Sequence, residues 1–311
     1  MTKIISSISK KPRAILFFGE MVIFFAIVIQ TLLQIQQIKT AFISTLTLVY
    51  QSLLPSLYPF MILSGIGTHF YNQFYMATQA TPSSKNGARL FLPYLMSVSF
   101  GFPIGAKIVN DLYNSRTITK GEGVRLFPLF NQTGFSFVTL VVGRNFLGSF
   151  SLGLKIYLVM ILSSFLVFFI YHKKEEHTFS IAECNRETEF SCVQLIKNST
   201  LNMIYIIGFL LAFTIPSTLI RTTFKRKSVS LVLSGLLEIT NGCHTIVTVL
   251  SRQSILLLPA LCFCVSFGGI CVGMQSEICV RDNRFSMKDY YIRKGLQGIF
   301  AFALGFLLNF L

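Results

Sequence analysis

The residues best suited to chemistry lie in an apolar run that begins near Ala88. Gly101, Pro103 and Gly105 interrupt this run, and Lys107 follows directly after them. Proline removes an amide donor and glycine weakens a helix, so the stretch predicts a broken helix. Broken backbone is tolerated at membrane depth only where it is buried in protein or lines a wet cavity. The break is therefore a candidate binding site.

A broken helix offers two kinds of unpaired backbone group, amides at one half-end and carbonyls at the other. The amide end carries a partial positive charge and suits an anionic group. Gly101 and Gly105 let the backbone approach a ligand, and Pro103 suits the first turn of the following half-helix. Lys107 lies on that half-helix. Its ammonium either complements a carboxylate substrate or reaches out to the membrane surface.

Polar residues interrupt other apolar segments too. A spacing of three would place Glu238 and Asn241 on one helical face, and a carboxylate there is costly unless it faces a cavity or a partner. Asn131 serves either a hydrogen bond between helices or a substrate contact. The predicted substrate-binding residues are Gly101, Pro103, Gly105, Lys107, Asn131, Glu238, Asn241, Gly268, Gly269 and Gln275.

Composition places the chain among polytopic membrane proteins. Of its 311 residues, 52% are hydrophobic and 13% charged, whereas a typical soluble domain has about 25% charged residues. The net charge of +15 arises mainly from basic residues at the ends of apolar segments. The positive-inside rule accounts for such a distribution, so we expect contact with the lipid bilayer and no nucleic-acid partner.

The motifs of enzymes and metal sites do not occur in the sequence. The seven cysteines include no CxxC pair, and the four histidines form no HExxH-type pair, so no metal ligand set is predicted. A GxxxxGK[ST] phosphate loop and a nucleophile–base motif do not occur either. The sequence therefore predicts a protein that is not an enzyme and uses no cofactor.

Nine apolar segments are predicted crossings, or eight if one of them is re-entrant. The first, 14–33, follows a basic N-terminus without a cleavage site, so it predicts an uncleaved helix with a cytoplasmic N-terminus. Residues 38–54 are amphipathic and predict an interfacial helix. Residues 71–87 and 172–191 predict polar loops. The remaining crossings are 55–70, 88–112, 123–142, 149–171, 193–220, 229–250, 255–278 and 291–311.

Short words recur in the same order in the two halves. VSFG at 98–101 returns at 265–268, and LPxL at 92–95 returns at 258–261. The pair Thr119/Glu122, which has the form of a capping box, returns as Ser286/Asp289. Corresponding segments are an odd number of crossings apart, so the repeats are predicted to be inverted. Inverted repeats with matching broken helices are typical of secondary transporters.

The predicted fold is an all-α polytopic membrane protein with eight to nine transmembrane segments in two inverted repeats with discontinuous helices. Its predicted parts are an anchor helix at 1–37, a first repeat at 38–148, connecting helices with a polar loop at 149–228, and a second repeat at 229–311.

Three stretches carry a family resemblance: LPSLYPF at 54–60, GFPIGAK at 101–107 and GLLEITNG at 235–242. Over roughly residues 50–311 the chain resembles the YlbJ family of sporulation integral membrane proteins, which carry a nucleoside-recognition or Gate domain. The resemblance implies a fold related to the concentrative nucleoside transporters. It also implies a role in endospore formation, where the family is associated with moving dipicolinic acid across the outer forespore membrane.

Two classes of function stay open at this point. The leading hypothesis is a cell-membrane protein that transports, or facilitates the passage of, a small anionic solute. A nucleoside-like solute is the alternative substrate within this class. The rival is an assembly or structural factor of sporulation that keeps the fold without transport. Either is compatible with an oligomer.

Overall fold

The computed structural model describes residues 2–78, 88–114, 118–172, 191–224, 226–250, 253–280, 283 and 285–310. In these ranges the chain is helical apart from short connections and contains no strand, which confirms the predicted all-α class. The first half contains α1 (Thr2–Leu33), α2 (Ile35–Leu48), η1 (Val49–Leu53), α3 (Leu54–Thr78), α4 (Ala88–Phe100), α5 (Ile104–Asn114), α6 (Lys120–Phe130) and η2 (Phe137–Phe146). The second contains α7 (Phe150–His172), α8 (Cys192–Thr223), α9 (Lys227–Leu237), α10 (Ile239–Val249), α11 (Leu257–Phe267), α12 (Gly269–Val280), α13 (Met287–Gly305) and η4 (Phe306–Asn309).

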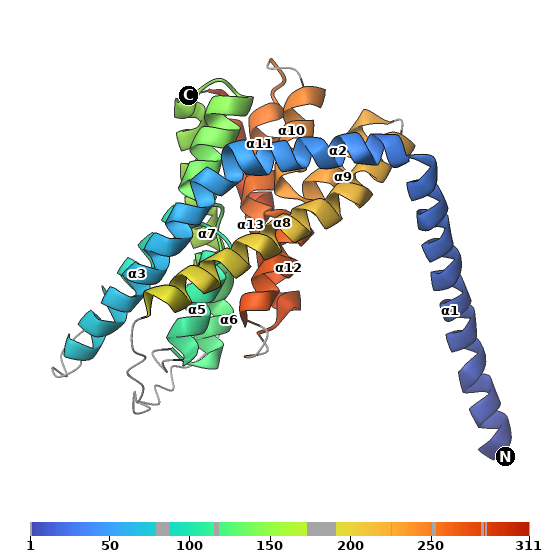
Figure 1. Ribbon diagram of the computed structural model, residues 1–311, viewed down its shortest axis with the longest axis horizontal. Coiled ribbons are helices and arrows are strands. Elements are labelled where there is room, and N and C mark those ends of the chain that lie inside the picture. Colours follow the sequence, from blue (N-terminus) through green and yellow to red (C-terminus); the bar gives the residue numbers. More distant parts are fainter. Residues whose placement is uncertain are drawn as a thin grey trace.

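The N-terminal helix α1 stands away from the other helices (Figure 1). From Phe18 to Leu33 its large apolar side chains are mostly exposed, and the chain then bends by 80° into α2. The amphipathic segment predicted at 38–54 forms α2 and η1. Its buried face packs on α8, where the hydroxyls of Thr45 and Thr214 hydrogen-bond at 3.1 Å.

Four helical stretches of the described residues are long and apolar enough to cross a membrane: Phe150–Tyr171, Cys192–Thr223, Leu257–Val280 and Met287–Asn309. A fifth is obtained if the bent pair Phe18–Leu33 and Ile35–Leu53 forms one span. The chain is thus an integral membrane protein by the length and composition of its helices. The predicted count of eight or nine is higher because it includes three crossings that the structure divides into two short helices. It also includes 55–70, which lies within α3 and is not among these stretches.

Four predicted crossings are divided in this way. Residues 88–112 form α4 and α5, 123–142 form α6 and η2, 229–250 form α9 and α10, and 255–278 form α11 and α12. The last of these pairs still passes as one apolar stretch. Helix ends are therefore concentrated inside the helical bundle, where each end leaves backbone groups that need partners.

One predicted loop is partly wrong. The segment 71–87 was expected to be a loop because it is polar, but α3 continues as far as Thr78. Tyr71 is buried in the hydrophobic core, so the helix is still packed against the bundle where the apolar run ends. Residues 79–87, like 173–190 of the second predicted loop, lie outside the described residues.

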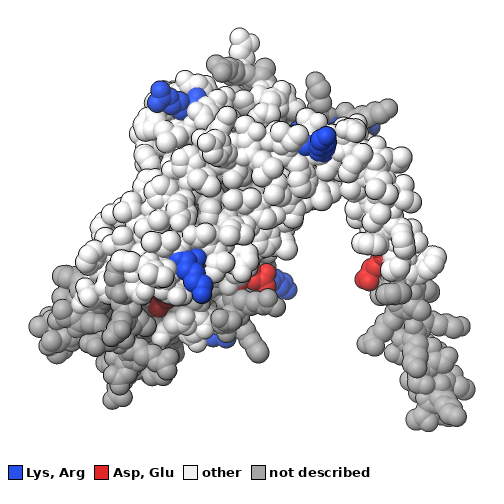
Figure 2. Space-filling view, in the orientation of Figure 1, with Lys and Arg blue, Asp and Glu red and all other residues white. Residues whose placement is uncertain are grey.

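Charged side chains are sparse on the surface of the bundle. On the face shown in Figure 2, the described Lys, Arg, Asp and Glu side chains lie in an upper and a lower group, and a broad uncharged band separates them. Apolar side chains such as Leu158, Leu162 and Ile204 are about half exposed on the long helices. Such a surface fits the hydrocarbon of a bilayer.

Candidate solute-binding site

The four helix breaks touch one another inside the bundle. The first lies at 101–103, where Gly101 has φ 80°. A Cβ atom on Gly101 would lie 2.2 Å from the amide nitrogen of Gly134, so two backbones are in contact there. Gly134 belongs to the second break, 131–134, which separates α6 from η2. The predicted break at Gly101 is confirmed, and a second one that the sequence analysis did not predict lies against it.

The second break is joined to the breaks of the C-terminal half. The hydroxyl of Thr133 donates to the carbonyl of Val265 at 2.6 Å, close to the third break at Gly268. Gly268 and Gly269 have φ angles of 82° and 85°, which confirms the predicted break there. A Cβ atom on Gly269 would lie 3.0 Å from the carbonyl oxygen of Leu237.

The contact between Gly269 and Leu237 reaches the fourth break, at residue 238, which separates α9 from α10. We call the connected residues 101–103, 131–134, 238 and 268 the row of breaks. Backbone contacts or hydrogen bonds join each break to the next, either directly or through a residue within three positions of it.

A buried lysine lies beside the row of breaks. Lys294, on α13, is 2% exposed. Its Nζ donates to the Oε1 of Gln297 at 2.8 Å, the Oε1 of Gln132 at 3.2 Å and the backbone oxygen of Asn131 at 3.3 Å. We call Gln132, Lys294 and Gln297 the lysine–amide cluster. All three acceptors are neutral oxygens.

Two hydrogen bonds fix the amide of Gln132 in the cluster. Its Nε2 donates to the carbonyls of Pro128 at 2.7 Å and Leu129 at 3.1 Å, which belong to the last turn of α6. The Nε2 of Gln297 donates to the Oε1 of Gln132 at 2.8 Å and to the carbonyl of Met160 at 3.2 Å. The break after α6 thus leaves carbonyls that a glutamine satisfies, and the oxygen of that glutamine is turned toward the ammonium.

The predicted site residue Asn131 forms a second polar layer. It is 1% exposed, and its Nδ2 donates to Ser276 Oγ at 2.7 Å and Tyr290 OH at 2.8 Å. Tyr290 stacks on Phe127 with 4.5 Å between ring centroids. The Oδ1 of Asn131 is buried without a hydrogen-bond partner. Asn131 therefore bridges α6, α12 and α13 and keeps one unused acceptor inside the protein.

Glu238 is placed differently from the prediction. It lies between α9 and α10, so it does not share a helical face with Asn241, and that argument was wrong. Its carboxylate is 1% exposed and accepts the backbone N–H groups of Thr240 and Asn241, both at 2.7 Å. Glu238 is thus the N-cap of α10, and the positive end of that helix stabilises the buried charge.

The predicted lysine and glycines of the first repeat lie on or beside the row of breaks. Lys107 is partly buried on α5, and its electrostatic partner among the described residues is Asp111, one turn further on. Both interpretations of Lys107 stay open. Gly105 is in close contact with the second break, because a Cβ atom there would lie 2.2 Å from the carbonyl oxygen of Phe130. Pro103 is buried directly before α5.

The remaining predicted residue, Gln275, is buried on α12. Its Nε2 donates to the Sγ of Cys271 at 3.3 Å. No described residue of the lysine–amide cluster bonds to it. Among the described residues, no three His, Cys, Asp or Glu side chains are grouped so that they could hold a metal ion.

Lys294 and Gln297 were not among the predicted site residues. Basic residues were expected at the ends of apolar segments, whereas the structure buries Lys294. The signal that could have found the pair is their spacing of three within the last apolar segment, which puts two long polar side chains on one helical face. The sequence had indicated Gln132 together with Asn131, as polar residues that interrupt the crossing 123–142. Ser276 was missed, although it too is a polar residue within a predicted crossing.

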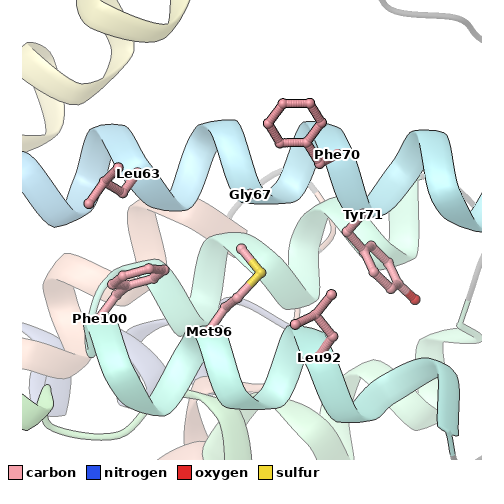
Figure 3. A pocket seen from close by; sticks show the side chains of 7 residues that line it. All are labelled: Leu63, Gly67, Phe70, Tyr71, Leu92, Met96 and Phe100. Carbon is pink, nitrogen blue, oxygen red and sulfur yellow. The ribbon is translucent and has the colours of Figure 1, made fainter.

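An apolar groove of about 380 Å³ lies between α3 and α4 (Figure 3). Side chains such as Leu63, Phe70, Leu92 and Met96 line it. Its lining contains no charged group, so it suits a hydrocarbon chain and offers nothing to an anion.

Comparison with protein families, curated proteins and solved structures finds no match to this chain.

Proposed function

We propose that the chain is a membrane transporter or facilitator of a small anionic solute. The observation that carries this proposal is the row of breaks. Four helix interruptions in contact within an apolar bundle are costly unless the freed backbone groups and side chains serve a function. Discontinuous helices that meet inside a membrane bundle are the usual construction of substrate sites in secondary transporters.

The proposed architecture has two inverted repeats and eight or nine crossings, with each broken pair counted as one crossing. Two correspondences support it. The Thr119–Glu122 capping box is present at the start of α6, and Ser286 accepts the N–H of Asp289 at 3.2 Å at the start of α13. Gly101 and Gly268 end α4 and α11 with nearly the same φ angle.

The resemblance to the YlbJ family supplies the biological setting of the proposal. It favours a dicarboxylate of the dipicolinic acid type, transported during endospore formation across the outer forespore membrane, with the N-terminus of the protein in the cytoplasm. A nucleoside-like solute is the variant within the same class.

Solute flux in reconstituted vesicles tests the proposal. The full chain is purified, reconstituted and assayed with labelled pyridine-2,6-dicarboxylate, succinate, benzoate and uridine, and protein-free vesicles serve as the blank. We expect saturable flux of at least one carboxylate. The substitution Gly101→Ala, which forces the first two breaks apart, should abolish that flux at equal protein content. No saturable flux of any solute by the folded wild-type protein would refute the proposal.

A second candidate, an assembly factor without transport, is favoured by α1. Its exposed apolar side chains stand away from the bundle, so a membrane helix of a partner can pack on them (Figure 1). This candidate predicts that partner capture in the membrane survives Gly101→Ala and is lost when residues 1–33 are deleted.

A further inference from the structure

The side chain of Lys294 has no acidic partner in the described part of the chain. Its three hydrogen bonds go to an amide oxygen of Gln132, an amide oxygen of Gln297 and a backbone carbonyl. Three donors matched to three oxygens is the full hydrogen-bonding capacity of an ammonium group. An ammonium buried in an apolar bundle without a carboxylate is costly, and buried charges in membrane segments are usually paired or functional.

The position of Lys294 along α13 places it at the third break. Gly298 is in contact with Phe263 and Phe267 of α11, and one turn on the other side of Lys294, the hydroxyl of Tyr291 donates to the carbonyl of Ile270 at 3.1 Å. Lys294 therefore lies level with the residues that separate α11 from α12. On its other side it contacts Asn131 and Gln132 of the second break.

One partner of Lys294 can be exchanged without uncapping a helix. The amide of Gln297 rotates about single bonds, and its Nε2 bonds to the carbonyl of Met160 within α7, whereas the Nε2 of Gln132 satisfies the last carbonyls of α6. A further unused acceptor, the buried Oδ1 of Asn131, lies in the adjoining polar layer. The site thus has one buried cation, neutral acceptors around it of which one can rotate, and polar capacity that the protein itself does not use.

We propose that Lys294, oriented by Gln132 and Gln297, binds the carboxylate of the solute when the second and third breaks separate. This assignment depends on the proposed transport function and specifies its binding residue. The single ammonium matches the single negative charge of one carboxylate group. A phosphate dianion carries both negative charges on one group and would lack a second cationic partner among the residues that bond to Lys294, so the site should discriminate against it. The two charges of a dicarboxylate lie on separate groups, and only one of these has to contact Lys294.

The test compares Lys294→Met with Lys288→Met, which removes an exposed lysine from the same helix. In reconstituted vesicles, Lys294→Met should raise the KM for the carboxylate that the wild type carries by about 10- to 100-fold, as expected for loss of a charged hydrogen bond. Lys288→Met should leave this KM unchanged. Inorganic phosphate should not compete with the carboxylate in the wild type. Unchanged carboxylate KM in Lys294→Met, or strong competition by phosphate, would overturn the assignment.

A second variant keeps the test decisive if Lys294→Met fails to fold. Gln297→Glu places a carboxylate where an oxygen lies 2.8 Å from the ammonium, so the protein itself supplies the negative charge. Stabilisation of the protein against heat by added pyridine-2,6-dicarboxylate should disappear in this variant and persist in Lys288→Met. Persistence of that stabilisation in Gln297→Glu would contradict the assignment.

The two proposals fail in different ways. If the wild type carries a carboxylate and Lys294→Met carries it with the same KM, the transport function stands and the assignment of Lys294 falls. If the wild type carries uridine but no carboxylate, the protein is a transporter of a nucleoside-like solute, and Lys294 has no role in binding an anion. If the wild type carries no solute, both proposals fall.

Discussion

Replacing glycines by alanine at four chosen positions tests whether the row of breaks is held by direct backbone contact. The positions differ in two properties: whether φ is positive, and whether a Cβ atom would meet another backbone. Gly295 has neither property, Gly268 has only the positive φ, Gly105 has only the close backbone, and Gly101 has both. The four variants therefore separate conformational strain from steric overlap.

The expected magnitudes follow from the geometry. For Gly268→Ala, the nearest atom lies 3.5 Å away, so the loss is the strain of a left-handed residue, about 1–2 kcal/mol. For Gly105→Ala, the new Cβ would lie 2.2 Å from the Phe130 oxygen, and overpacking of this kind costs about 1–3 kcal/mol. Gly101→Ala combines both effects, about 2–5 kcal/mol in total.

Gly295→Ala is the matched control. It lies within α13 with no atom within 4 Å of the new Cβ, so it should stabilise the protein by about 0.5–1 kcal/mol.

Thermal melting of the four purified variants in detergent provides the measurement. The melting temperature should be highest for Gly295→Ala, lower for Gly268→Ala and Gly105→Ala, and lowest for Gly101→Ala. If Gly105→Ala melted like Gly295→Ala, α5 would not lie against the second break. If Gly101→Ala were no worse than Gly268→Ala, the contact between the first two breaks would not exist.

Three further substitutions or modifications have defined outcomes. Glu238→Ala removes two charge-assisted hydrogen bonds at the start of α10 and should destabilise the protein by about 1–3 kcal/mol, because the bonds lost outweigh the burial cost relieved. The control Glu277→Ala, at an exposed position, should melt like the wild type, and equal melting of the two variants would contradict the capping role. Thr119→Val removes half of a capping box and should cost about 0.5–2 kcal/mol in the same assay; an unchanged melting temperature would argue against that cap. A maleimide should label the exposed Cys192 in the native protein but label the buried Cys264 only after unfolding, as read by mass spectrometry of the peptides; native labelling of Cys264 would contradict the packing of α11.

The breaks whose glycines stand in apolar runs could be predicted from the sequence, and the other two could not. Gly101 and Gly268–Gly269 stand in apolar runs where a helix has no use for glycine, so the prediction had a local cause. The break at 131–134 has only polar and small residues, Asn-Gln-Thr-Gly, and these also occur within continuous membrane helices. The break at Glu238 lacks any helix breaker, and it is the packing of Gly269 against Leu237 that favours it.

The direction of a side chain on a helix was the second feature of the site that the sequence could not predict. Arg293 and Lys294 are neighbours near the start of the last predicted crossing, where basic residues were expected at a membrane surface. In the structure the guanidinium of Arg293 lies over the ring of Tyr171, 4.4 Å from its centroid, while Lys294 points into the bundle. Consecutive residues diverge by about 100° around a helix, so only the packing of α13 on its neighbours decides which one is buried.

The two buried charges of the C-terminal half differ in how their partners could respond to a ligand. Both hydrogen bonds to the carboxylate of Glu238 come from backbone N–H groups in the first turn of α10, so releasing the carboxylate would leave a helix end without its cap. The shortest hydrogen bond of the Lys294 ammonium goes to the side chain of Gln297, which can turn away without leaving a helix end uncapped. A solute that replaces the amide oxygen of Gln297 by a carboxylate oxygen replaces a neutral acceptor by a charged one, which adds a Coulomb attraction that is strong away from water. The physical gain from binding an anion is therefore larger at Lys294, although the sequence pattern had favoured residues 101–107 and 238–241.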